Sequence, residues 1–285
     1  MTMATGRRAW LTFLLLSLGA VAAGSVTLLL NRGAPSSVLF NPAGWLIGLA
    51  LSLLLLCFGG GPGIQRAILA ITPIGLAATL LAAPVEAVHR WIDIGPIHAN
   101  MAALLIPAAI VAIARTGLRH PFTLCAIAAI ATLLIAQPDA SQATAFLLAC
   151  WVGLIRERIS GRAKLAALAL AAVLAAVAWL RPDPLEAVAE VEGIVRLAWL
   201  LSPAITIFGV LALAGASLAP LAAAPSPGGS ATMLAVYFAT VALCTLFGNF
   251  PVPLIGLGMS FPLGYWLGIG LLCARKPDRP AARTA

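Results

Sequence analysis

The sequence predicts an all-α polytopic membrane protein with about ten transmembrane helices, and its composition supports this fold class. Hydrophobic residues make up 62% of the 285 residues, charged residues only 9%, and the mean hydropathy is +1.05. Soluble domains carry roughly 45–50% apolar and about 25% charged residues. These figures argue against an ordinary soluble enzyme, a disordered chain or a secreted disulfide-rich domain. The apolar runs are continuous rather than alternating, which argues against an outer-membrane barrel.

Ten apolar stretches approach the length of about 20 residues that a membrane-spanning helix needs. In chain order they are Trp10–Leu30, Gly44–Phe58, Ala67–Val85, Met101–Ala114, Pro121–Ala136, Gln142–Ile155, Leu165–Leu180, Ile194–Leu221, Ala231–Gly248 and Leu254–Leu272. The first could be a signal peptide, but its continuation to Leu30 favours a retained helix. We therefore expect a single integral membrane domain over residues 1–285, with a basic, disordered cytoplasmic tail at residues 274–285.

The basic residues predict the orientation of the chain in the membrane. With both termini cytoplasmic, 13 of the 17 Lys and Arg residues fall in inner segments, as the positive-inside rule requires. The outer four are Arg32, Arg90, Arg181 and Arg196. Because the basic residues are dispersed among loops, the net charge of +8 does not indicate nucleic-acid binding.

The five cysteines lie within or at the ends of apolar runs and form no CxxC pair and no Cys/His cluster. We expect buried apolar side chains rather than a disulfide or metal framework. His89 and His98 also lack the tight spacing of metal ligands, so loop polarity explains them better than a metal site.

Four polar segments on the expected outer side carry most of the chemistry-bearing residues. They are residues 86–100, 137–142, 181–196 and 249–260. An unpaired charge beside hydrocarbon costs about 2.5–3.5 kcal/mol at the centre of a helix, so these charges should pair or face water. Their acids, with the outer arginines, could line an outward polar cavity that holds a catalytic carboxylate.

Three short motifs in these segments resemble those of the SEDS family, the FtsW/RodA-like cell-wall polymerases. Residues 90–96, RWIDIGP, resemble the family's RW-x-x-(L)G-P stretch, and residues 137–139 resemble its QPD. Residues 251–255, PVPLI, with Gly258 and Ser260, resemble its P-x-P-(L/F)-(I/L)-S-Y-G-G-S stretch. The motifs occur in the family's order and on the outer side, and the number of spans agrees.

The resemblance implies polymerisation of a lipid-linked disaccharide precursor, an undecaprenyl-linked sugar, at the outer face of the bacterial cytoplasmic membrane, with a penicillin-binding-protein-like partner. It places Glu192 where the family has its essential aspartate, with Glu190 and Asp183 as neighbouring candidate acids. The candidate substrate-binding residues are Arg90, Arg196, Asp139, Asn100, Pro251 and Ser260. A carboxylate would deprotonate the acceptor hydroxyl, and Arg side chains or a divalent metal ion would stabilise the leaving pyrophosphate.

The chain departs from the family pattern in the same segments. Its large outward loop is cut to about residues 181–193 and lacks the Q-S-x-x-A-I-G-S-G-G stretch, and residues 198–200 are AWL where the family has G-E-E. The glutamate and the glutamine of the family's Q-P-S-E fall at Ala103 and Asn100. A second class of function therefore stays open: a catalytically degenerate scaffold in cell-wall assembly or division, or a lipid or solute transporter.

The candidate acids also have structural interpretations. Glu190 and Glu192 could belong to a short interfacial helix over Leu185–Gly193, and a helical Glu192 could pair with Arg196 at i,i+4. Asp183 lies between two prolines, as a turn residue would.

The remaining candidates have structural interpretations of the same kind. Arg90 could bind pyrophosphate or pair with Glu86 or Asp93. Asp139 is expected to cap the helix that follows it. Two prolines one residue apart predict a non-helical break at Pro251–Ile255, beside the outward cavity.

Overall fold

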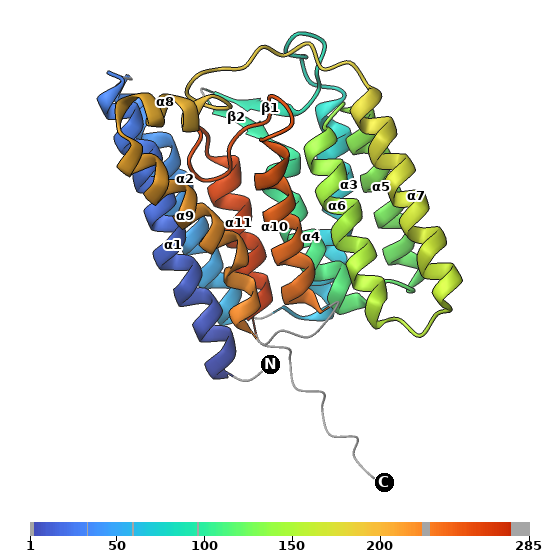
Figure 1. The fold of residues 1–285 in the computed structure, drawn as a ribbon. Coiled ribbons are helices and arrows are strands. Elements are labelled where there is room, and N and C mark those ends of the chain that lie inside the picture. The colour runs from blue at the N-terminus through green and yellow to red at the C-terminus, as the bar shows by residue number, and fades with distance from the viewer. Residues whose placement is uncertain (1–2, 33, 59, 96, 224–228, 275–285) are drawn as a thin grey trace.

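Eleven α-helices and one two-stranded β-ribbon make up the described part of the chain in a computed structural model (Figure 1). The structure describes residues 3–32, 34–58, 60–95, 97–223 and 229–274. The helices are α1 (Met3–Leu30), α2 (Pro35–Phe58), α3 (Pro62–Thr79), α4 (Met101–Thr116), α5 (Pro121–Ala136), α6 (Ala140–Gly153), α7 (Gly161–Leu180), α8 (Ile194–Leu201), α9 (Pro203–Leu218), α10 (Ser230–Cys244) and α11 (Ser260–Cys273). Two short 3-10 helices are η1 (Leu154–Arg156) and η2 (Ala219–Ala223). The all-α fold class is confirmed, whereas residues 275–285 of the expected tail lie outside the described residues.

The predicted spans correspond to single helices except for the eighth. The expected helix over Ile194–Leu221 is wrong, because the chain breaks at Ser202 into α8 and α9. Ser202 is extended, with φ −164°, and its side chain accepts a hydrogen bond from the Ile205 amide at the start of α9. Pro203 lacks a backbone donor and suits the first turn of a helix better than its interior. Ser202 therefore ends α8 and caps the start of α9.

Several helices have the length and apolarity that a membrane span requires. Among the described residues, four meet both criteria: Thr5–Leu30, Ser37–Phe58, Gly161–Leu180 and Pro203–Ala223. Five further apolar helices are shorter, with 10–17 residues each. On α7, Leu165, Leu170 and Val173 are each more than half exposed, and an apolar outer face of this kind suits lipid rather than water. The chain is a multi-pass helical membrane protein.

Helix α11 occupies the centre of the bundle and packs on α1, α2 and α4. Its Tyr265 stacks on Phe238 of α10 with ring centroids 3.7 Å apart, and Trp266 meets Phe13 of α1 edge-on at 4.8 Å. At Gly264 an added Cβ would lie 2.0 Å from a backbone oxygen of α4, so the two helix backbones touch there. Small residues allow such close approach between spanning helices.

The non-helical segments gather at one end of the bundle. Figure 1 shows the β-ribbon, α8 and the long loops together at this end, while α1 begins and α11 ends at the other. Strands β1 (Trp91–Ile94) and β2 (Ile97–Asn100) pair antiparallel, with Trp91 opposite Asn100 and Asp93 opposite His98. The sequence analysis did not predict this ribbon, since four-residue strands leave almost no periodic signal.

All five cysteines are free thiols. Cys150 and Cys244 are buried and Cys273 is partly buried, as expected, but Cys57 and Cys125 are exposed. Burial of every cysteine was therefore a wrong expectation: Cys57 of α2 and Cys125 of α5 are exposed beside exposed apolar residues, Phe58 and Leu124.

Candidate functional site

A cavity of about 390 Å³ lies at the loop end of the bundle. Its walls come from the β-ribbon, the loop between α7 and α8, the loop between α10 and α11, and the first residues of α11. Phe40, Trp91, Met259 and Phe261 give it large apolar surfaces, and its ionisable side chains are Glu186, Glu192 and His98. An apolar cavity with a few polar groups is the usual form of a site for a small molecule or a lipid head.

Four of the nine candidate residues line this cavity. They are Glu192, Asn100, Pro251 and Ser260. Pro251 belongs to the segment Pro251–Ile255, which is non-helical as predicted and separates α10 from α11. The Asn100 side chain caps α4 by accepting from the Ala103 amide at 2.9 Å, while its own backbone amide donates to Ser260 Oγ at 2.9 Å. The ribbon and α11 are thereby joined at the floor of the site.

Glu192 is the carboxylate best placed for proton transfer. The expected helix over Leu185–Gly193 is wrong: the chain is extended and then makes a tight turn at Ala189–Glu192. The turn is closed by the Glu192 side chain, because Oε2 accepts from the Val188 amide at 2.9 Å. Partial burial raises the pKa of the Glu192 carboxyl; its bond to the Val188 amide and the charge of Arg90 oppose this rise, and the charge of Asp183 adds to it. A raised pKa beside a cavity is typical of a general base.

The other acid-and-base pairings expected in this segment do not form. Among the described residues, Arg196 makes no ion pair with Glu192, because Glu192 precedes α8 and the i,i+4 relation needs both in one helix. The Glu190 side chain instead accepts from Asn31 Nδ2 at 3.4 Å, and Glu190 does not line the cavity. Arg196 is exposed on α8.

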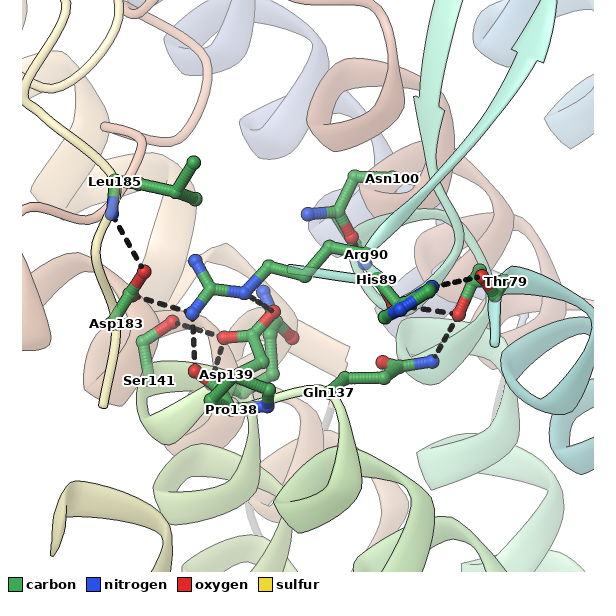
Figure 2. A network of polar contacts seen from close by, with 12 residues as sticks. Thr79, His89, Arg90, Asn100, Gln137, Pro138, Asp139, Ser141, Asp183 and Leu185 are labelled. Atoms are coloured by element: carbon green, nitrogen blue, oxygen red, sulfur yellow. Dashed lines mark hydrogen bonds and ion pairs between the residues drawn. The ribbon is translucent and has the colours of Figure 1, made fainter. Parts of the chain in front are cut away.

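Arg90 forms a buried ionic network behind the cavity wall (Figure 2). Its Nη2 lies 2.6 Å from Asp183 Oδ2 and also donates to the Pro138 carbonyl. Its Nε lies 3.8 Å from Asp139 Oδ2. The expected pairing of Arg90 with Glu86 or Asp93 is wrong, because the guanidinium points toward the α5–α6 junction rather than along its own loop.

The QPD segment at residues 137–139 is a joint between helices. Asp139 caps α6 as predicted, since Oδ1 accepts from the Gln142 amide at 3.2 Å. Figure 2 shows Gln137 reaching the other way, where Nε2 donates to Thr79 Oγ1 at 2.6 Å. Arg90 and Asp139 thus link the segments before α4, before α6 and after α7, and neither residue lines the cavity.

Sequence reasoning missed three polar residues of this region. Glu186 lines the cavity but was seen only as one of several outer acids. His98, treated as loop polarity, also lines it, and its Nδ1 lies 2.6 Å from Asp93 Oδ1. Asn41 of α2 binds the loop between α10 and α11. A polar residue in an apolar span was the available signal for Asn41.

The described residues hold no group of three or more His, Cys, Asp or Glu side chains arranged to bind a metal ion.

Comparisons with known proteins show a similarity in fold but none in sequence family. The sequence matches no protein-family model and no curated protein. The solved rod-shape-determining protein RodA of Thermus thermophilus is 18% identical, with a TM-score of 0.64 over 91% of this chain and 94% of that chain. A mutant of the same protein gives 19% identity, a TM-score of 0.64 and the same coverage. A chain from a peptidoglycan synthase complex, described for its structural coordination of polymerization and crosslinking, gives 20% identity and a TM-score of 0.61 over 92% and 95% of the two chains.

The resemblance found in three short motifs is thus matched by the course of almost the whole chain. The chain has a RodA-like fold.

Proposed function

We propose that this protein is a peptidoglycan glycosyltransferase that polymerises a lipid-linked disaccharide precursor at the outer face of the cytoplasmic membrane. The observation that supports this function best is the Glu192 carboxyl, partly buried in the wall of an outward cavity with its pKa raised by that burial. A second support is the RodA-like fold of this chain, in which Glu192 lies in the loop before α8–α9, the eighth of the expected spans.

In this proposal Glu192 is the general base. Its carboxylate takes the proton from the 4-hydroxyl of the acceptor sugar, and the oxygen forms a bond to the anomeric carbon of the donor. The bond from that carbon to the lipid pyrophosphate breaks, and the pyrophosphate leaves with the electron pair. A positioned base accelerates such a step by about 10²–10⁴-fold. The apolar walls around Phe261 and Trp91 hold the sugar away from bulk water.

The decisive experiment is polymerisation of a labelled lipid-linked precursor by the purified protein, alone and with a penicillin-binding-protein-like partner. Glu192→Gln keeps the size and one hydrogen-bonding oxygen but removes the base, so activity should fall by about 10²-fold or more. Glu190→Gln is the matched control, because Glu190 carries the same charge two residues away without lining the cavity. Full activity in Glu192→Gln would remove this residue from the mechanism.

A catalytically degenerate scaffold is the second candidate, and the charges of the cavity favour it. No Lys or Arg is among the described residues that line the cavity, and Arg90 is occupied by two carboxylates. A pyrophosphate leaving group normally meets positive charge. If the wild-type protein polymerises nothing under any condition but still binds its partner, the scaffold becomes the better proposal.

Orientation and partner are part of the same proposal. Both termini face the cytoplasm and the cavity faces outward, in line with the distribution of Lys and Arg. The chain of a peptidoglycan synthase complex among the similar structures supports a cell-wall partner.

A further inference from the structure

We infer that Asn41 is the positioning residue of the candidate site: it holds the loop at residues 251–258, and this loop holds the turn that carries Glu192. The catalytic consequence rests on the glycosyltransferase function proposed above. The brace between α2 and the two outer segments rests on hydrogen bonds alone.

Asn41 lies fully buried near the start of α2. Its Nδ2 lies 3.2 Å from the carbonyl oxygen of Leu254, 3.3 Å from that of Ile255 and 2.8 Å from that of Gly256. Its Oδ1 accepts from the Gly258 amide at 2.7 Å. One side chain therefore contacts four backbone groups within a five-residue stretch of a different segment.

The loop needs such a partner because its own backbone is not regular. Leu254, a residue with a side chain, has φ +64°, and Val252 and Ile255 are buried. Buried carbonyl groups outside a helix must find donors from elsewhere, above all at membrane depth. An asparagine side chain supplies both a donor group and an acceptor, and no apolar residue could replace either.

The loop is attached in turn to the segment before α8 through backbone contacts. The Leu257 amide donates to the Glu190 carbonyl at 2.8 Å, and the Val252 amide lies 3.4 Å from the Val191 carbonyl. At Gly256 an added Cβ would lie 2.5 Å from the Val191 oxygen, so the two backbones are in direct contact. The position of the loop at residues 251–258 therefore fixes the position of the turn at Ala189–Glu192, which carries the candidate base.

Glycines on the neighbouring helices bring their backbones onto the same loop. Gly44 lies one turn after Asn41 on the same face of α2, and its added Cβ would lie 2.8 Å from Met259 Cα. At Gly24 of α1 the added Cβ would lie 2.2 Å from the Ile255 oxygen. These close approaches fix the distance at which the Asn41 amide can reach the loop.

Loss of this brace should change the chemistry of Glu192 as well as its position. Partial burial is the main cause of the raised pKa of this carboxyl, and a loosened turn admits water and lowers that pKa. A displacement of about 1 Å can cost on the order of 10²-fold in rate. A residue with a structural role only would reduce the amount of folded protein without shifting the pH dependence of the remainder.

The first measurement is hydrogen–deuterium exchange of the full-length protein in lipid nanodiscs. Asn41→Leu removes the donor and the acceptor at similar size, and Asn41→Asp sets a carboxylate against three carbonyl oxygens. Ser52→Ala is the control: Ser52 is fully buried on the same helix, accepts from Trp10 Nε1 at 2.9 Å, and lies about 16 Å along the axis from Asn41.

Both Asn41 variants should raise exchange about tenfold or more in residues 251–258 and in residues 188–193 together, while Ser52→Ala leaves both segments unchanged. Faster exchange in residues 251–258 with unchanged exchange in residues 188–193 would show that the loop does not hold the turn. Unchanged exchange in both segments would show that Asn41 does not hold the loop. Should Asn41→Leu fail to insert, Asn41→Gln, which displaces both groups by one methylene, should give the same pattern at smaller amplitude. Normal exchange in that variant would count against the inference.

The second measurement is polymerisation as a function of pH. Both Asn41 variants should lower kcat about 10–100-fold with little change in KM, and the acid limb of kcat/KM should move to lower pH. Ser52→Ala should keep the wild-type profile. An unshifted limb would make Asn41 structural only. An inactive wild-type protein would refute the glycosyltransferase function and leave the exchange data to decide on the brace.

Discussion

The Arg90 guanidinium lies 2.6 Å from the Asp183 carboxylate, and this ion pair fastens the loop between α7 and α8 to the loop before β1. Arg90 is 3% exposed and also approaches Asp139, which is equally buried. The α7–α8 loop lacks regular structure over residues 182–188, so this contact is a principal anchor of the segment that forms one wall of the cavity.

Arg90→Ala should destabilise the protein by about 3–5 kcal/mol, because it leaves the Asp139 carboxylate buried without its counter-charge. Thermal unfolding in detergent micelles measures the effect. Arg181→Ala is the control, because Arg181 is exposed with a single 3.5 Å contact to a carbonyl, and it should change stability by less than about 0.5 kcal/mol. Adding Asp139→Asn to Arg90→Ala should recover part of the loss. Equal stability of Arg90→Ala and wild type would contradict the structural role.

Glu192 should make stability depend on pH with a defined sign. Folding raises its pKa above the ordinary value of 4.5, so the folded state binds the proton more tightly than the unfolded state does. The stabilisation is complete below the unfolded-state pKa and is lost as the pH rises through the folded-state pKa. Glu192→Gln should therefore unfold at the same or a higher temperature than wild type at neutral pH, with the gap closing in acid. If Glu192→Gln is less stable than wild type only at neutral pH, folding lowers the Glu192 pKa instead of raising it.

The same carboxyl should set the acid limb of the pH profile of polymerisation. Activity should rise with pH as Glu192 ionises, and the midpoint of kcat/KM should lie above the ordinary glutamate value. Glu186 and His98 line the same cavity, so Glu186→Gln and His98→Gln separate their contributions. If the acid limb of kcat/KM shifts in Glu186→Gln or His98→Gln but does not shift in Asn41→Leu, the group that titrates is not Glu192.

Contact between α4 and α11 should make Gly264 intolerant of any side chain. An added Cβ would meet the Ala103 oxygen at 2.0 Å, and overpacking of this kind costs about 1–3 kcal/mol. Gly63→Ala is the control, because nothing lies within 4 Å of its added Cβ. In a helix this change should be neutral or up to about 1 kcal/mol stabilising. Unfolding temperatures of the two variants, measured side by side, test the pair; equal values would contradict the close packing.

Cysteine labelling tests the orientation. In a background where the exposed Cys57 and Cys125 are replaced by alanine, Ala187→Cys should react with a membrane-impermeant maleimide from outside. Ser160→Cys, in the loop between α6 and α7, should react only after the membrane is opened. Labelling of position 160 in intact cells would contradict the predicted orientation and indicate the opposite one.

Hydrophobic content and span lengths alone predicted the helical membrane fold, because an apolar run in lipid has to satisfy its backbone within a helix. The course of nine of the ten expected spans followed from that rule. The break at Ser202 did not, because hydropathy does not change there. Pro203 was the only local signal of the division into α8 and α9.

Local chemistry likewise predicted the features that depend on neighbours in the chain: the Asp139 cap, which needs only the amide three residues on, and the non-helical Pro251–Ile255. Only the tertiary structure decided the long-range partners. Asp183 meets Arg90 from 93 positions away, and Asn41 meets Gly258 from 217. No periodicity encodes such pairs, because the relative placement of whole helices sets the distance between their side chains.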